Sequence, residues 1–380
     1  MPALPVQVRD VQGRNPRKAR RLFVIAVAGT LAVVATALAV RIVLTDARLP
    51  GSPVSTRVAL IRMWDPGDLG SRDEAGMSPF VEGLLAAERE HGVETEILDL
   101  FPRRPLMGGR GDPGSQADAD RLSARLRSGD FDLVVWPFGP APWFVDVVAQ
   151  YPDTRFVFLD YCCVDGIELR GAPNATTLSS RAGQAGQLAG YLSGLMEARR
   201  ALPQGGRHMV SIISAEPNFP PTYVVLEGFI RGAKRALPAV EVRYDYSSEY
   251  DDQAACDEIA NRQIDAGSGV VFAAVMDCGL GALSAAAIRG VWGIASGGED
   301  MSHLGPHILA SASERYGRLV ELAVGWYLEG RLPPREDVAL GLVDGAVALV
   351  GISPDVPTSI RAKVAQEAAR LRAQEARQPE

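Results

Sequence analysis

Short apolar runs alternate along the chain with longer segments in which apolar positions recur at helical spacing. The run at 58–63 (VALIRM) precedes an amphipathic segment at 78–92, and apolar runs follow at 93–100 and 131–138. Strand-length runs that alternate with helices of ten or more residues indicate βαβ units, in which helices cover both faces of a parallel sheet. The pattern therefore predicts an α/β fold.

The same alternation resumes in the second half of the chain. A strand expected at 174–180 leads into a helix at 182–200, and a strand at 208–214 leads into a helix at 222–237. Further strands are expected at 155–161, 240–246, 269–275, 291–296 and 307–313, helices at 141–152, 252–266, 314–330 and 362–377, and a final apolar run at 338–351. Two similar halves predict two lobes, each built on a doubly wound parallel sheet.

The N-terminal part of the chain follows another pattern. Residues 22–40 contain no charged side chain. A helix of this length rises about 28 Å, close to the hydrocarbon core of a bilayer at ~30 Å. Arginine and lysine residues are concentrated in the preceding 14–21 segment, so the positive-inside rule places residues 1–21 in the cytoplasm. We expect one transmembrane helix at 22–44, with the bulk of the chain outside the cell membrane.

This apolar segment is either a permanent anchor or a cleaved signal. Ala37-Leu38-Ala39 has the small-x-small form that a signal peptidase recognises. The uncharged run is, however, longer than the roughly 7–15 residues of a usual secretory signal. Length therefore favours an uncleaved anchor, with cleavage as the alternative.

The distribution of charge is consistent with this division. Residues 1–21 carry six Lys or Arg and one Asp, a net charge of +5, whereas the whole chain carries −7. The remaining residues therefore carry −12. A nucleic-acid partner normally requires a basic face, so this acidic exterior argues against one.

Several stretches of the expected exterior part resemble a known family. In order along the chain they are PDTRFVFLDY, NATTLSSRAGQAGQLAGYLSGLM, LEGFIRGAKRALPAVEV, GVVFAAVMDCGLGALSAAAIRGVWGI and VALGLVDGAVALVGISPDVPTSIRAKV. Their order is similar to that of the basic membrane protein family, over roughly residues 57–375. Members of that family are substrate-binding proteins of ABC transporters, typically for nucleosides, with the type I periplasmic binding protein fold.

The resemblance implies two hinged lobes that hold a ligand at the carboxyl ends of their strands. It places the hinge crossings near 174–180, 305–313 and 338–347. The implied organisation is a cytoplasmic basic segment at 1–21, the membrane segment at 22–44, a linker at 45–56, lobe 1 at 57–172 plus 314–336, lobe 2 at 173–313 plus 337–352, and a C-terminal helix and tail at 353–380.

The sequence also departs from the family pattern at positions that contact ligand. Gly76 and Met77 stand where the family has the Phe and Asn that contact the base, and Gly297 stands near the ribose-binding Asp. Glu314 aligns with a family Lys, which reverses the charge, whereas Asp160 aligns with a family Asp. These departures argue against recognition of a purine nucleoside by the usual residues.

The ends of the expected strands supply candidate ligand-binding residues. An aromatic sandwich flanked by carboxylates suits a flat, hydroxylated or amine-bearing ligand. Glu314 would also suit a cation held partly by cation–π contact. The alternative interpretation places any of the aromatic residues in the core. The candidates are Trp64, Asp65, Trp136, Phe138, Asp160, Phe219, Asp277 and Glu299, and the resemblance adds Glu314 through its alignment with the family Lys.

Cysteine and histidine positions add one structural prediction. Cys256 lies early in an expected helix and Cys278 lies just after the next strand, so neighbouring βα connections predict a disulfide between them. The adjacent pair 162–163 is compatible with free thiols, a vicinal disulfide or a redox-sensitive pair. C-x-x-C spacing is absent, and Gly305-Pro306 interrupts the two histidines at 303 and 307, so we expect neither a metal nor a cofactor.

We therefore expect a membrane-anchored solute-binding protein that delivers a small polar, nucleoside-like ligand to ABC permease subunits. Nothing in the sequence points to a catalytic site, so we expect no enzymatic activity. The alternative function is a membrane-tethered ligand-sensing or regulatory domain that is not coupled to transport.

Overall fold

The structure is a computed structural model, and the part that it describes begins after the expected membrane segment. It describes residues 55–62, 73–99, 116–137, 144–160, 172–202, 204–217, 220–297 and 300–377. Among these residues, none of the helices combines the length and hydropathy that a bilayer crossing needs. The predicted transmembrane helix at 22–44 lies outside the described residues.

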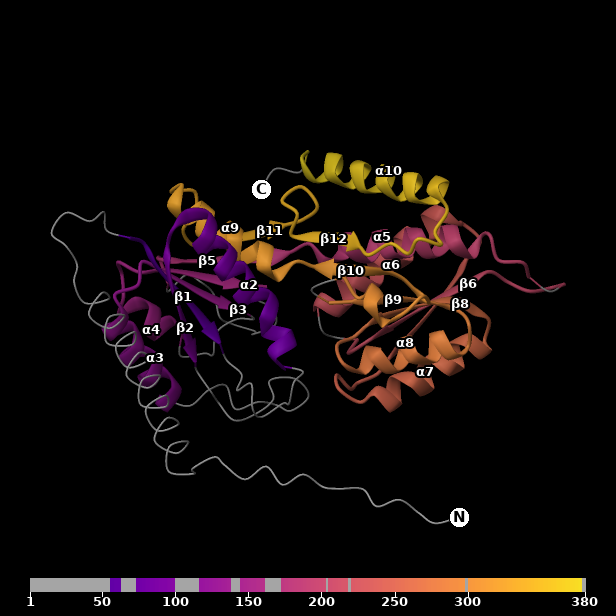
Figure 1. Cartoon of the computed structure of the whole chain (residues 1–380), viewed down its shortest axis with the longest axis horizontal. Coiled ribbons are helices and arrows are strands. Elements are labelled where there is room, and N and C mark those ends of the chain that lie inside the picture. The colour runs from indigo at the N-terminus through magenta and orange to yellow at the C-terminus, as the bar shows by residue number, and fades with distance from the viewer. Residues whose placement is uncertain are drawn as a thin grey trace, which may run out of the picture. The chain divides into compact units, whose positions relative to one another are not determined.

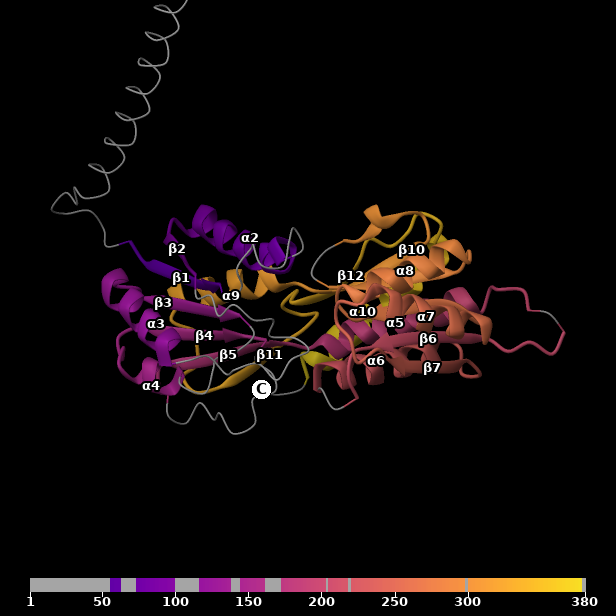
Figure 2. The same cartoon turned by 90° about the horizontal axis from the view of Figure 1, so that it is seen from below.

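Lobe 1 is built on a six-stranded sheet with the order β11-β5-β4-β3-β1-β2 (Figures 1 and 2). The five strand pairs of this sheet are all parallel, as the sequence predicted. The strands are β1 (Arg57–Arg62), β2 (Glu94–Asp99), β3 (Leu133–Pro137), β4 (Arg155–Leu159), β5 (Ala175–Ser180) and β11 (Asp337–Leu340).

Helices cover both faces of the lobe 1 sheet because each strand alternates apolar residues between two cores. Helices α2 (Asp73–His91) and α9 (Tyr316–Leu328) pack on the face that carries Leu60 and Val135. Helices α3 (Gln116–Gly129) and α4 (Phe144–Ala149) pack on the opposite face. The helices packed on both faces fix the positions of the strand ends.

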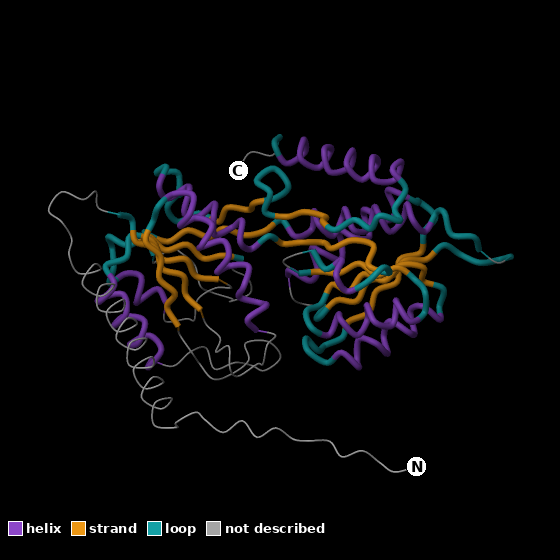
Figure 3. The backbone as a smooth tube through the Cα atoms, viewed as in Figure 1, coloured by secondary structure: helices purple, strands orange, loops and turns teal. Residues whose placement is uncertain are grey.

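Lobe 2 contains a second six-stranded sheet, with the order β12-β10-β9-β8-β6-β7. Helices lie on both sides of its strands (Figure 3). Its strands are β6 (Met209–Ser214), β7 (Glu241–Tyr246), β8 (Ser268–Ala274), β9 (Trp292–Ser296), β10 (Ile308–Glu314) and β12 (Val347–Val350). One face packs against α5 (Ala182–Glu197), α6 (Pro220–Ala236) and α10 (Thr358–Glu375), and the other against α7 (Gln253–Asp265) and α8 (Cys278–Ile288). A short 3₁₀ helix, η3 (Ser302–Leu304), precedes β10.

Three segments connect the two sheets. The first crossing runs from β5 into α5, the second from β10 into α9, and the third from β11 into β12. Lobe 2 was predicted to begin at residue 173 and again at 337, but β5 pairs with β4 and β11 pairs with β5. Both strands therefore belong to the lobe 1 sheet, and the crossings begin at their carboxyl ends.

The third crossing also differs from the expected continuous run at 338–351. Residues 341–346 form a turn between β11 and β12, and β12 pairs antiparallel with β10. The sheet of lobe 2 is therefore mixed, not entirely parallel as predicted, because the chain enters it from the other lobe in the reverse direction.

Helix α10 packs along α5 and reaches the third crossing (Figure 1). Ile360, Val364 and Leu371 are buried in the lobe 2 core. In its last turns, Arg372 Nε donates to the carbonyl oxygen of Leu342 at 3.2 Å, and Glu375 Oε2 accepts from the Val343 amide at 3.1 Å. These bonds attach the 341–346 turn to lobe 2.

Candidate ligand-binding site

Two carboxyl groups and one serine meet where the first two crossings begin. Ser180 is the last residue of β5, Asp160 follows the neighbouring strand β4, and Glu314 ends β10. The Ser180 amide donates to Asp160 Oδ1 at 2.8 Å, and the Ser180 hydroxyl donates to Glu314 Oε2 at 2.5 Å. A single serine thus connects a lobe 1 strand end to the end of a lobe 2 strand.

The backbone of Asp160 has an unusual conformation that suits this contact. Its φ of +50° lies in the left-handed region, which Asp and Asn adopt more readily than most other residues. The Asp160 amide donates to the Leu178 carbonyl oxygen at 2.8 Å, which continues the ladder between β4 and β5. The chain then turns, and the side chain accepts from Ser180.

Burial, then the neighbouring Asp160 charge and a side-chain interaction with Asp160, together raise the pKa of Glu314 to about 8, although the Ser180 hydrogen bond lowers it. A carboxyl group with this pKa is mostly protonated at neutral pH. Asp160 and Glu314, called here the carboxyl pair, therefore retain a proton under physiological conditions.

The arginines that flank the carboxyl pair in sequence are bonded to other groups. Arg181 Nε donates to the Ala339 carbonyl oxygen at 2.9 Å, and Arg315 Nη1 donates to that of Gly345 at 3.3 Å. Arg318 donates to the Asp344 carbonyl oxygen at 3.2 Å. These guanidinium groups stabilise the third crossing and leave the carboxyl pair as a hydrogen-bonding site of negative character.

The structure brings only some of the predicted site residues together. Asp160 and Glu314 are joined through Ser180, and Asp277 lies on lobe 2, immediately before α8. Trp136 is 0% exposed and packs in the lobe 1 core, with its ring centroid 5.8 Å from that of Phe158. The candidates that lie outside the described residues are Trp64, Asp65, Phe138, Phe219 and Glu299.

Ser180 is the site residue that sequence reasoning missed. It ends a stretch that was expected to be a hinge crossing, and a hydroxyl at the carboxyl end of such a strand is a weak signal for a polar contact. A cavity of about 180 Å³ lies elsewhere, between α3 and α4, and is lined by residues that include Ser123, Arg127 and Gln150. No residue of the carboxyl pair lines it.

The described residues include no group of three or more His, Cys, Asp or Glu side chains arranged to hold a metal ion. His303 is exposed, and its Nδ1 lies 3.3 Å from the Asp300 carbonyl oxygen. The ring of His307 lies 6.3 Å from that of Trp292. The two histidines thus have separate surroundings.

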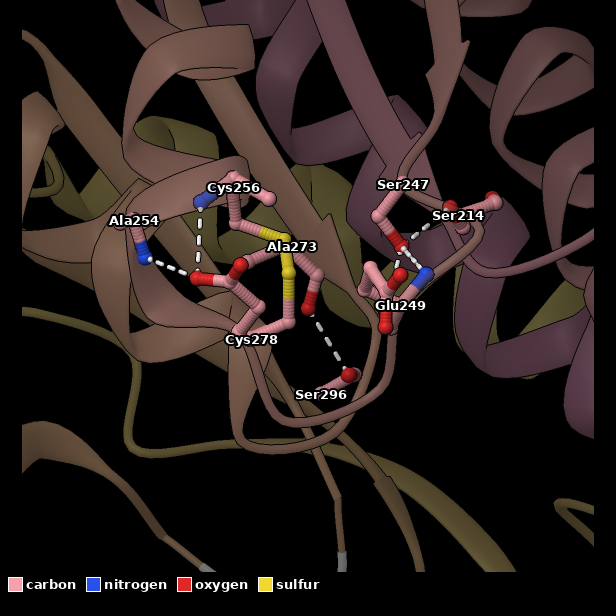
Figure 4. Close-up of a disulfide and its surroundings, with 10 residues drawn as sticks. Ser214, Ser247, Glu249, Ala254, Cys256, Ala273, Cys278 and Ser296 are labelled. Atoms are coloured by element: carbon pink, nitrogen blue, oxygen red, sulfur yellow. Dashed lines mark hydrogen bonds between the residues drawn. A yellow bond between two sulfur atoms is a disulfide. The ribbon is translucent and has the colours of Figure 1, made fainter. Parts of the chain in front are cut away.

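Cys256 and Cys278 form the disulfide that the sequence predicted, with Cα atoms 5.5 Å apart (Figure 4). Cys256 lies in the first turn of α7, which Asp252 caps by accepting from the Ala254 and Ala255 amides. Cys278 begins α8 at the carboxyl end of β8. The bridge joins the starts of two neighbouring helices beside the strand ends of lobe 2. The pair 162–163 lies outside the described residues.

Replacing both bridged cysteines with serine should lower the free energy of unfolding by ~2–3 kcal/mol, because the bridge restricts the unfolded chain. Chemical denaturation of the oxidised protein and of the Cys256→Ser/Cys278→Ser variant checks this. Adding a reductant should lower the free energy of unfolding of the wild type but leave that of the variant unchanged. Equal stability of the oxidised wild type and the variant would show that the thiols are not bridged.

Comparisons with known proteins give one family and many similar folds. A family model described as Bmp, ABC transporter substrate-binding protein PnrA-like, matches residues 61–376. No curated protein sequence matches the chain.

Solved structures of similar fold include both binding proteins and a regulator. One is a transcriptional activator of the comK gene from Bacillus halodurans, 22% identical over 86% of this chain and 100% of that chain, with a TM-score of 0.64. Another is an ABC transporter solute-binding protein from Conexibacter woesei, 21% identical over 86% of this chain and 99% of that chain, with a TM-score of 0.62. A third is an ABC transporter periplasmic solute-binding protein from Actinobacillus succinogenes with bound D-allose. It is 13% identical over 78% of this chain and 97% of that chain, with a TM-score of 0.54. These likenesses support a fold of the periplasmic binding type.

Proposed function

Because the chain belongs to the Bmp family of ABC transporter substrate-binding proteins, we propose that it is the solute receptor of an ABC importer. The family match over residues 61–376 is the observation that carries this proposal. In this role the protein would bind its substrate without converting it. The type I periplasmic binding fold, with two lobes that close on a ligand, is the architecture that this role requires.

The proposed ligand is a small polar molecule that carries hydroxyl groups, such as a nucleoside or a sugar. Parallel sheets bind ligands beyond the carboxyl ends of their strands, and Asp160, Ser180 and Glu314 lie at such ends. Carboxyl oxygens accept hydrogen bonds from hydroxyl or amine groups. The D-allose bound to the structure from Actinobacillus succinogenes supports a hydroxylated ligand in this proposal.

The proposed location is the outer face of the cell membrane, with the apolar segment at 22–44 as a single-pass anchor. The basic residues before this segment support a cytoplasmic N-terminus. An ABC permease would be the macromolecular partner, and it would contact both lobes when the ligand is bound.

Thermal unfolding of the full-length protein against a panel of nucleosides, sugars and amines tests the binding role. A true ligand at about 100 times its dissociation constant should stabilise the protein by ~2.7 kcal/mol. Asp160→Asn tolerates the left-handed backbone but removes the charge, and should weaken binding at least tenfold, or ~1.4 kcal/mol. Isothermal titration with the compound identified in the panel measures this loss.

Glu258→Gln is a matched control, because this glutamate is exposed on α7 and pairs with Arg262. Its ligand affinity should equal that of the wild type. If no compound stabilises the protein, the solute-binding proposal fails. If Asp160→Asn binds normally, the proposed position of the site is wrong although the binding role stands. Unchanged uptake of the ligand after deletion of the gene would favour the sensing role instead.

A further inference from the structure

Ser180 connects the first and second crossings through its side chain. The first crossing leaves β5 at Ser180, and the second leaves β10 at Glu314, 134 residues later in the sequence. The hydroxyl of Ser180 donates to Glu314 at 2.5 Å, while its amide donates to Asp160 at 2.8 Å. The segments that must bend when two lobes move are therefore joined to each other and to the end of β4.

Ser180 holds both carboxyl groups of the pair. Its hydroxyl has one hydrogen, which it donates to Glu314 Oε2, and its amide donates to Asp160 Oδ1. An ionised carboxylate is only an acceptor, so two neighbouring carboxyl groups can bond to each other only when one of them is protonated. Two carboxyl groups held on one serine are therefore placed to share a proton.

No described cation is paired with the two carboxyl groups. Arg181 lies 3.6 Å from Glu375 and donates to the carbonyl oxygen of Ala339, and Arg315 donates to that of Gly345. Arg318 pairs with Glu321 at 2.9 Å.

Three further titratable groups near the crossings contact other residues. The ring of Tyr316, at the start of α9, stacks on that of Phe80. Asp344 Oδ2 accepts from the Gly341 amide in the third crossing, and Asp300 Oδ1, before η3, accepts from the Ser302 amide. On β12 the residue opposite Glu314 is Val347, which is apolar.

We propose that Asp160, Ser180 and Glu314 form a proton-dependent latch that holds the first and second crossings together. With one proton on the carboxyl pair, all three hydrogen bonds form and the two crossings move as one. After the proton leaves, two like charges lie side by side, the bond between the carboxyl groups is lost, and the crossings separate. The latch joins the two crossings directly, and because the proposed ligand site uses the same three residues, it is tested in the protein without ligand.

The expected transition lies in the mildly alkaline range. Burial and the Asp160 charge raise the pKa of Glu314 to about 8, so the latch is closed at neutral pH and opens above that value. Glu314→Gln is a chemical mimic of the protonated state: its amide nitrogen can donate to Asp160 and its oxygen can accept from Ser180 at every pH. Ser180→Ala removes the bond between the crossings without changing the charge.

Hydrogen–deuterium exchange of the full-length protein at pH 6.5 and pH 9.5, corrected for intrinsic exchange rates, tests the latch. Peptides that cover 175–181 and 312–320 should lose at least tenfold protection at the higher pH in the wild type. Glu314→Gln should keep the same protection at both values, and Ser180→Ala should be poorly protected at both. A peptide that covers β8 serves as the internal reference. Equal protection of the wild type at both pH values, or the same loss in Glu314→Gln, would overturn the proposal.

Infrared difference spectroscopy locates the proton independently. The wild type should show a protonated carboxyl band at pH 6.5 that disappears by pH 9.5, and Glu314→Gln should lack this titrating band. A band that titrates unchanged in Glu314→Gln would place the proton on another group and contradict the latch. Neither measurement requires a ligand, so both remain informative if the proposed transport role fails.

Discussion

Replacing Trp136 with alanine is expected to lower the free energy of unfolding by ~3–5 kcal/mol, the range for removal of a buried aromatic side chain. Trp136 lies in the central part of the lobe 1 sheet, is 0% exposed, and packs against Phe158. Its removal would leave a cavity that strands paired on both sides cannot close. Denaturant unfolding of the ligand-free protein measures the loss.

Trp326→Ala provides the matched comparison. Trp326 is only partly buried at the edge of the other lobe 1 core, with the Arg331 guanidinium 5.1 Å from its ring centroid. The Trp326→Ala protein should lose less stability than the Trp136→Ala protein, because Trp326 buries less of its apolar surface on folding. A Trp136→Ala protein with near wild-type stability but no ligand binding would return this residue to the ligand site and contradict its assignment to the core.

Glu314→Gln is expected to make the protein more stable at alkaline pH, by ~2–3 kcal/mol at pH 9. A shift of one pKa unit corresponds to ~1.4 kcal/mol, and partial solvent access reduces the full value. The unfolded side chain ionises near its model value of 4.5, whereas the pKa of Glu314 in the folded protein is raised to about 8. Between these values the folded state binds more protons, so wild-type stability falls as pH increases. Glutamine removes this dependence.

Unfolding free energies of the wild type and of Glu314→Gln, measured from pH 4 to pH 9, test whether wild-type stability falls as the pH rises. The two proteins should be similar at pH 4, diverge as the pH rises, and differ by a constant amount above about pH 8. Glu367→Gln is the control of opposite sign. Burial opposes ionisation of Glu367, but hydrogen bonds from Arg370 and Arg235 outweigh it and lower its pKa. Its neutralisation should therefore destabilise the protein at neutral pH. A Glu314→Gln protein less stable than wild type at pH 9 would contradict the raised pKa.

The element order was largely predictable because period and length separate strands from helices in a βαβ chain. The strand at 174–180 and the helix at 182–200, for example, correspond to β5 and α5. Which sheet a strand joins was not predictable. Residues 338–351 are apolar on both sides of the Asp344-Gly345 turn, and only tertiary hydrogen bonds assign 337–340 to one sheet and 347–350 to the other.

The site was predictable in part, for related reasons. Asp160 follows from its position at an expected strand end and Glu314 from its alignment with a family Lys, but their link through Ser180 depends on two segments far apart in the sequence. Trp136 belongs to a run that is apolar at every position from 133 to 137, so alternation cannot tell which face it occupies. The raised pKa of Glu314 arises from burial, which a strand-end position does not reveal.

Helix α10 has a consequence for how the two lobes could rotate. Because Arg372 and Glu375 fasten the 341–346 turn to lobe 2, the pivot of the third crossing is confined to the short stretch around Leu340 and Gly341. The last turns of α10 therefore restrict bending of the chain next to this pivot. A fluorescent reporter fused after residue 377 would sit next to this axis, where lobe rotation displaces it least, so distance sensors should be attached far from it.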